Sequence, residues 1–136
     1  VSASDDDGKL FVYLSQITAP GTFAAALQLT SPGASQVVIA DLNGDDLPDL
    51  VSADFSVNVF LQAAAGSFLA PFSLSAGGAS WVASGDLNHD GLPDLVVTDG
   101  DLLEVKTQIK NLFIAGKNVS LETKHTKLYE KYLARP

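Results

Sequence analysis

Residues 33–54 read GASQVVIADLNGDDLPDLVSAD, and residues 78–99 read GASWVASGDLNHDGLPDLVVTD. The second stretch lies 45 residues after the first, and 14 of the 22 aligned positions are identical. A further half-copy opens the chain, because VSAS at residues 1–4 parallels VSAD at 51–54, and FVYLSQ at 11–16 parallels NVFLQ at 58–62. Repeats of about 20 to 50 residues are typical of solenoids, propellers and arrays, whose units cannot bury an apolar face alone.

Within one repeat, apolar and polar residues alternate, as at Val57, Val59 and Leu61, and this alternation indicates β-strands. We expect four strands in each unit, at residues 36–40, 50–53, 57–62 and 68–74, with residues 81–84 opening the next unit. Four short antiparallel strands in about 45 residues match the size of a propeller blade. The prediction for residues 1–101 is therefore a mainly β fold with about two to two and a half four-stranded antiparallel β-propeller blades.

A nine-residue loop joins the first two strands of each unit and carries polar side chains at positions 1, 3, 5 and 9. These side chains are Asp41, Asn43, Asp45 and Asp49 in the first loop, and Asp86, Asn88, Asp90 and Asp94 in the second. The clustered carboxylates would repel one another unless a cation neutralised them, and oxygen ligands suit calcium. The backbone carbonyls of Leu47 and Leu92, at position 7, would complete the sets. The sequence therefore predicts two Ca²⁺ ions; the competing interpretation is an Asp-rich hairpin turn without an ion.

The segments DLNGDDLPDLV and DLNHDGLPDLVV resemble the calcium loops of FG-GAP or VCBS repeats, which form blades of integrin-alpha-type propellers and of many secreted bacterial proteins. The family pattern is Asp-x-Asp/Asn-x-Asp/Asn-Gly-x-x-Asp between two strands, so the resemblance implies ligand roles for the same eight side chains. Gly91 matches the family glycine, whereas Asp46 departs from it. We expect a left-handed backbone at this position, which Asp tolerates less well than Gly, so the first site would be weaker or distorted.

Composition excludes several classes of protein. The chain has no Cys and its two His are His89 and His125, which rules out disulfides, thiolate nucleophiles, cysteine-based zinc sites and multi-histidine metal cages. No run of about 18 apolar residues occurs, so we expect no membrane span. No set of acid, base and nucleophile is visible, and we expect no enzymatic activity. Trp81 has two interpretations, stacking on a sugar or packing within a blade, and the second is favoured.

Charge divides the chain near residue 102. Residues 1–102 hold 13 Asp, no Glu and one Lys, a net charge of −12, whereas the remainder holds three Glu and seven Lys or Arg, a net charge of +4. The acidic part repels phosphate, so no nucleic-acid partner is expected. Residues 102–136 form a basic tail that we expect to contain helix, above all at residues 120–134, where apolar residues follow one helical face. For residues 102–115 the pattern leaves two alternatives, a helix or, at residues 103–108, the third strand of a last blade.

Loops, repeat and resemblance together predict a non-catalytic, calcium-binding propeller module of an extracellular or cell-surface protein, with a role in adhesion, recognition or scaffolding and a protein or glycan ligand. Two alternatives stay open: an accessory propeller of a secreted enzyme that acts on polysaccharide or lipid, and a carbohydrate-binding lectin. Two blades are fewer than the roughly four to eight of a closed propeller. Since the chain also starts at Val1, we expect a piece of a longer propeller, a self-assembled ring, or a tail that covers the open blade.

Overall fold

The computed structural model describes residues 2–4, 8–16, 18–31, 34–101, 103, 106–114 and 117–121. Every regular element in this part of the chain is a β-strand, and the strands pair in antiparallel fashion. The mainly β fold that the alternating pattern predicts is therefore confirmed. These described residues contain no helix that is both long enough and apolar enough to span a bilayer.

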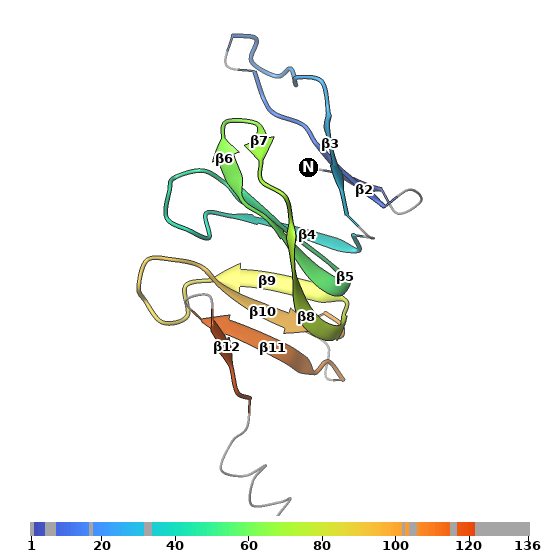
Figure 1. Ribbon diagram of the computed structural model, residues 1–136, viewed down its shortest axis with the longest axis vertical. Helices are drawn as coiled ribbons and strands as arrows, with labels where there is room; N and C mark the ends of the chain where they lie inside the picture. The colour runs from blue at the N-terminus through green and yellow to red at the C-terminus, as the bar shows by residue number, and fades with distance from the viewer. Residues whose placement is uncertain are drawn as a thin grey trace, which may run out of the picture.

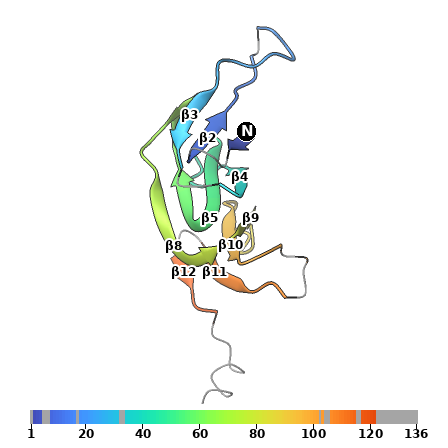
Figure 2. The ribbon, with the colours of Figure 1, turned by 90° about the vertical axis from the view of Figure 1, so that its right-hand side faces the viewer.

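Three sheets make up most of the described fold and follow one another along its long axis (Figures 1 and 2). The first sheet contains β1 (Ser2–Ser4), β2 (Lys9–Val12) and β3 (Leu27–Thr30). The middle sheet contains β4 (Gln36–Ala40), β5 (Asp49–Phe60) and β8 (Phe72–Ala79), and β6 (Gln62–Ala64) and β7 (Ser67–Phe68) form a small ribbon beside it. The last sheet contains β9 (Trp81–Gly85), β10 (Asp94–Thr98), β11 (Ile109–Ile114) and β12 (Lys117–Val119).

The long strand β5 folds back on itself. A straight strand of 12 residues would span about 40 Å, yet the Oδ1 atom of Asp49 lies 2.8 Å from the backbone nitrogen of Gln62, beyond the other end of β5. The chain reverses near Phe55, which has a positive φ of 48°. The first half of β5 pairs with β4 and the second half with β8. The middle sheet thus has strands where alternation predicts the first three, while the fourth begins at Phe72 rather than at residue 68.

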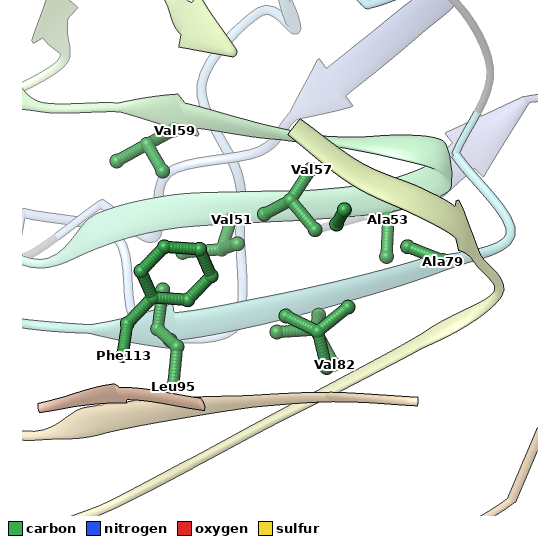
Figure 3. Close-up of a cluster of buried hydrophobic side chains, with 10 residues drawn as sticks. Val51, Ala53, Val57, Val59, Ala79, Val82, Leu95 and Phe113 are labelled. Carbon is green, nitrogen blue, oxygen red and sulfur yellow. The ribbon is translucent and has the colours of Figure 1, made fainter. Parts of the chain in front are cut away.

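Two apolar clusters hold the three sheets together. Because successive residues of a strand point to opposite faces, β5 contributes to both of them. One cluster joins the first and middle sheets through Leu10, Val12, Leu50 and Phe60. The other joins the middle and last sheets (Figure 3), chiefly through Val51, Val57, Val59, Val82, Leu95, Val97 and Phe113. Complete burial of an aliphatic or aromatic side chain of this size contributes about 1.5–3 kcal/mol, so these clusters are the main source of cohesion between the sheets.

The last sheet continues past residue 101, where the change in charge suggests a boundary. β11 pairs with β10, and β12 pairs with β11, so residues 109–114 are a strand and the helical alternative is wrong there. Ile109, Leu112 and Phe113 do follow helical spacing, but burial of Phe113 in the cluster between the sheets outweighs that weak pattern. The helix expected at residues 120–134 falls outside the described residues, apart from residues 120 and 121, which are not helical.

Candidate functional site

The two aspartate-rich loops occupy equivalent places in neighbouring sheets. The first loop, residues 41–49, connects β4 to β5, and the second loop, residues 86–94, connects β9 to β10. Both project on the left-hand side of Figure 1. The two loops also lie close together at Gly44 and Leu92. A Cβ atom built onto Gly44 would be 3.1 Å from the Cδ2 atom of Leu92, so a larger residue than glycine would crowd the second loop. The fold therefore brings all ten predicted site residues into two adjacent loops.

In the first loop, the polar side chains turn back onto the loop's own backbone. The Oδ1 atom of Asp41 accepts hydrogen bonds from the N–H groups of Gly44 at 2.8 Å and Asp45 at 3.2 Å, and its Oδ2 atom accepts one from Asp46 at 2.8 Å. Asn43 accepts from the N–H of Asp45 at 3.1 Å and donates its amide to the Asp45 carboxylate at 3.0 Å. Asp45 in turn accepts from the N–H of Leu47 at 2.9 Å. Short Asp and Asn side chains favour this kind of local turn.

The second loop repeats this arrangement 45 residues later. Asp86 accepts hydrogen bonds from the N–H groups of Asp90 at 3.2 Å and Gly91 at 3.0 Å. Asn88 accepts from Asp90 at 2.9 Å and donates to its carboxylate at 2.8 Å, and Asp90 accepts from the N–H of Leu92 at 2.9 Å. Seven of the nine loop residues are identical, and the polar ones among them form corresponding hydrogen bonds in both loops.

Position 9 has a different role from the other three polar positions. Asp49 is fully buried, and its carboxylate accepts hydrogen bonds from the N–H groups of Leu42 at 2.9 Å and Gln62 at 2.8 Å. Asp94 is also buried and accepts from the N–H of Leu87 at 2.9 Å. These two carboxylates anchor each loop to the sheet below it. Sequence spacing alone did not indicate this role, although each Asp directly precedes a buried leucine at the start of a strand.

Backbone conformation confirms the expectation for position 6. Asp46 has a φ of 64° and Gly91 a φ of 88°, so both are left-handed. Position 4 shares this conformation, with a φ of 76° at Gly44 and 60° at His89, which the sequence analysis did not anticipate. His89 is exposed to solvent. Each loop therefore contains one non-glycine residue in a conformation that favours glycine.

Two of the loop carboxylates, those of Asp41 and Asp90, have lowered pKa values. Desolvation raises the pKa of Asp41, but hydrogen bonds from the N–H groups of Asp46, Gly44 and other loop residues outweigh it and hold this pKa below the ordinary value of 3.8. The N–H of Leu92 and the amide of Asn88 likewise lower the pKa of Asp90, against an opposing effect of desolvation. Both side chains therefore carry a negative charge at neutral pH.

The donor set suits a hard cation in its chemistry, but its side chains do not converge. An ionised carboxylate has about four acceptor sites, so Asp41, with three hydrogen bonds, and Asp45, with two, keep some capacity for a ligand. Across the part of the chain that the structure describes, however, no three acidic or histidine side chains form a group that could hold a metal ion. A calcium site here would therefore need oxygens besides those of the acidic side chains.

An apolar cavity of about 220 Å³ lies beside the loops. Asn43 supplies the one polar side chain among its lining residues, which are Leu42, Asn43, Val59, Leu61, Phe72, Leu74, Pro93, Leu95 and Phe113. Trp81, the residue considered for sugar stacking, is 40 % exposed at the start of β9. It lies opposite Thr98 of β10 and is partly accessible to solvent.

Comparison with known proteins gives one match, and it covers both loops. Neither the curated proteins nor the solved structures contain a significant match to the chain. The matched segment starts at Asp41, the first residue of the first loop, and ends at Val97 in β10. Residues 41–97 match the family model described as the FG-GAP-like repeat, so this segment of the chain is similar to that repeat.

Proposed function

We propose that the chain is a calcium-binding β-propeller repeat module, without catalytic activity, of an extracellular or cell-surface protein. In this proposal the three sheets are propeller blades, and each aspartate loop binds one Ca²⁺ ion. The observation that carries it is the recurrence of one hydrogen-bonded loop, 45 residues apart, inside a segment that matches the FG-GAP-like repeat. Both loops retain every polar side chain at positions 1, 3, 5 and 9, and this supports a shared role for those positions.

Different loop positions would contribute in different ways. Positions 1, 3 and 5 are at least partly accessible to solvent, so their oxygens are the first that an incoming ion meets. The carbonyl groups of Leu47 and Leu92 follow at position 7. The buried Asp49 and Asp94 already hold backbone N–H groups and keep the loop on its sheet. A bound calcium ion supplies positive charge that offsets the repulsion among the loop carboxylates, which makes the loops more rigid.

Rigid loops on one side of a stacked set of sheets suit adhesion, recognition or scaffolding, with a protein or a glycan as ligand. One observation favours the glycan. Trp81 is 40 % exposed, and an indole that is partly in solvent can stack on the apolar face of a sugar ring. A lectin activity would appear as binding on a glycan array that Trp81→Ala abolishes, whereas a scaffold would leave the array blank.

Calorimetric titration of calcium into chelator-treated protein tests the metal proposal. We expect two sites with dissociation constants of about 10⁻⁴ to 10⁻³ M, the range of extracellular modules. Asp45→Asn should remove the first site and Asp90→Asn the second. Asp54→Asn is the matched control, because Asp54 lies outside both loops, where it accepts a hydrogen bond from Ser35 at 3.4 Å. The proposal is wrong if no heat is released and the melting temperature is the same in millimolar calcium and in chelator.

A further inference from the structure

The first aspartate loop contains a chemically reactive pair of residues. Asn43 is followed by Gly44, whereas the other four asparagines of the chain are followed by larger residues, namely Val59, His89, Leu112 and Val119. The amide carbon of an asparagine can react with the backbone nitrogen of the next residue, and glycine hinders this approach least because it has no side chain. The equivalent pair in the second loop is Asn88 and His89, so one loop has the reactive sequence and the other lacks it.

The fold favours glycine at position 44 for two reasons. Gly44 has a left-handed φ of 76°, and a Cβ atom built there would lie 3.1 Å from the Cδ2 atom of Leu92 in the second loop. A side chain that would slow the reaction is therefore disfavoured at this place. His89 has a similar φ of 60°, so the two loops differ here in the size of the residue and not in the hand of the backbone.

The hydrogen bonds of the loop fold the Asn43 side chain toward the residues that follow it. Its Oδ1 atom accepts a hydrogen bond from the N–H of Asp45 at 3.1 Å, which closes an Asx turn across Gly44. The turn keeps the amide carbon of Asn43 within the same short ring of atoms as the backbone nitrogen of Gly44. Asn43 is also exposed to solvent, so water reaches its amide.

Two contacts of the closed loop oppose the reaction. The N–H of Gly44 donates to the Oδ1 atom of Asp41 at 2.8 Å, and the Asn43 amide donates to the Asp45 carboxylate at 3.0 Å. Both hydrogen bonds must open, because the reaction removes the proton of the Gly44 nitrogen and releases the amide group. Both lie at the exposed surface, where water can replace them. The reaction therefore requires a local opening of the loop and not the unfolding of the chain.

We propose that Asn43 is a site of spontaneous deamidation. The backbone nitrogen of Gly44 bonds to the amide carbon of Asn43, and the carbon–nitrogen bond of the side-chain amide breaks. The amide nitrogen leaves as ammonia, with the proton that the Gly44 nitrogen has lost and that water carries across. One water molecule then opens the five-membered imide. Opening at the side-chain carbonyl gives an aspartate, and opening at the backbone carbonyl gives an isoaspartate, in which the main chain runs through the side chain.

Deamidation reverses the sign of one contact in the first loop. The hydrogen bond of 3.0 Å from the Asn43 amide to the Asp45 carboxylate becomes a contact between two carboxylates. The modified loop carries one more negative charge and depends more strongly on a cation for its conformation. One consequence rests on the proposed function: the aspartate product should bind calcium more tightly than the unmodified loop, because affinity depends on the number of charged ligands. The modification itself does not require calcium.

Mass spectrometry of the full, folded chain tests the proposal. The protein is incubated in chelator at mildly alkaline pH and digested with chymotrypsin, and its peptides are compared with those of protein that was not incubated. Deamidation raises the mass of a peptide, because oxygen replaces NH, whereas an Asp–Gly pair such as Asp90 and Gly91 can form the same imide without a change in mass. We expect conversion of Asn43 at a rate no more than about tenfold below that in urea-unfolded chain, because an exposed loop opens at little cost. Asn88 should stay unmodified over the same period.

Exchange of the reactive pair between the loops gives the sharpest result. His89→Gly places glycine after Asn88 at a left-handed position that suits it, so this variant should also convert at Asn88. Asn43→Gln should lose the conversion in the first loop. Circular dichroism verifies that each variant is folded. The proposal is overturned if Asn43 stays intact in the folded chain while it converts in urea, or if Asn88 of the wild-type chain converts as fast as Asn43. Failure of His89→Gly to convert at Asn88 would overturn the role assigned to glycine.

Asn43→Asp supplies the main product directly and tests its effect on the loop. In chelator it should lower the melting temperature by about 2–5 °C, because two carboxylates then face each other. An unchanged melting temperature would overturn this effect. The outcomes for modification and metal are separate. Deamidation without calcium binding refutes only the metal proposal, and calcium binding to a chain in which Asn43 never converts refutes only the proposed modification.

Discussion

Replacement of Asp49 by Ala should destabilise the chain strongly, whether or not calcium is present. Asp49 is fully buried and accepts hydrogen bonds from the N–H groups of Leu42 at 2.9 Å and Gln62 at 2.8 Å. Alanine offers no acceptor, so both N–H groups lose their partner. A hydrogen bond to a charged group contributes about 1.5–3 kcal/mol, which gives a loss of about 3–6 kcal/mol for the two. Removal of a buried charge offsets part of this loss, so we expect a value near the lower end, about 3 kcal/mol.

Urea unfolding, followed by the fluorescence of the single tryptophan, Trp81, measures this loss. Asp45→Ala is the matched control in the same loop. Its carboxylate also accepts a backbone hydrogen bond, from Leu47 at 2.9 Å, but the side chain is exposed and water can replace the acceptor. Without calcium, Asp45→Ala should therefore cost less than about 1 kcal/mol. The difference between the two variants isolates the effect of burial.

This reasoning would be refuted if Asp49→Ala lowered the free energy of unfolding in calcium but left it unchanged in chelator. That outcome would make the carboxylate primarily a metal ligand and not an anchor of the loop. Asp94→Ala provides a second measurement, because Asp94 is 2 % exposed and accepts a hydrogen bond from the N–H of Leu87 at 2.9 Å. It too should destabilise the chain in chelator, whereas a role as metal ligand alone would confine the effect to calcium.

Three further predictions follow from the structure. Asp46→Gly and His89→Gly should each raise the stability by up to about 1 kcal/mol in thermal melts, because their φ angles of 64° and 60° suit glycine. Phe113→Ala should cost about 3–5 kcal/mol in urea unfolding, against little for the control Phe55→Ala at an 81 % exposed position. The N–H of Gln108 and the Lys110 ammonium lower the pKa of Asp99 below 3.8, so its contribution to stability is present above that pH and is lost as the pH falls through the lowered value. Asp99→Asn should therefore flatten the acid side of a stability curve measured from about pH 5 to about pH 2.

Sequence could predict the strands of the middle sheet because a constant spacing of 45 residues relates it to the start of the last sheet. That spacing fails after Asp99. The segment VNVFL at residues 57–61 corresponds to KNLFI at 110–114, a spacing of 53, so eight residues have entered the connection between β10 and β11. The connection closes on itself, with the N–H of Asp99 donating to the carbonyl of Gln108 at 3.2 Å. An alignment at fixed spacing cannot detect such an insertion, and it consequently places the alternative third strand at residues 103–108, whereas β11 spans Ile109–Ile114.

The aspartate loops show a different limit of sequence analysis. Spacing identified which side chains gather in each loop, and the positive φ of Asp46 and Gly91 was deduced from the family glycine. Spacing does not say which oxygens the backbone already occupies. Asp41 and Asp49 are both acidic, yet one forms the turn at the outer end of the loop and the other is buried beneath it. Burial depends on the strands on either side, and that information is spread over residues distant in sequence.

Lys110 shows how an apolar sheet face can remain in solution. Lys110 is the first residue of KNLFI at residues 110–114. The corresponding segments of the other two sheets, LFVYL at 10–14 and VNVFL at 57–61, begin with Leu10 and Val57, which are both 0 % exposed. By strand alternation it lies on the same side of β11 as Leu112, and its ammonium group forms an ion pair with Asp99 at 3.0 Å. A lysine on an exposed sheet opposes indiscriminate pairing with other strands. A partner for this face would therefore have to accommodate the charge of Lys110 at the position where the other two sheets bury Leu10 and Val57.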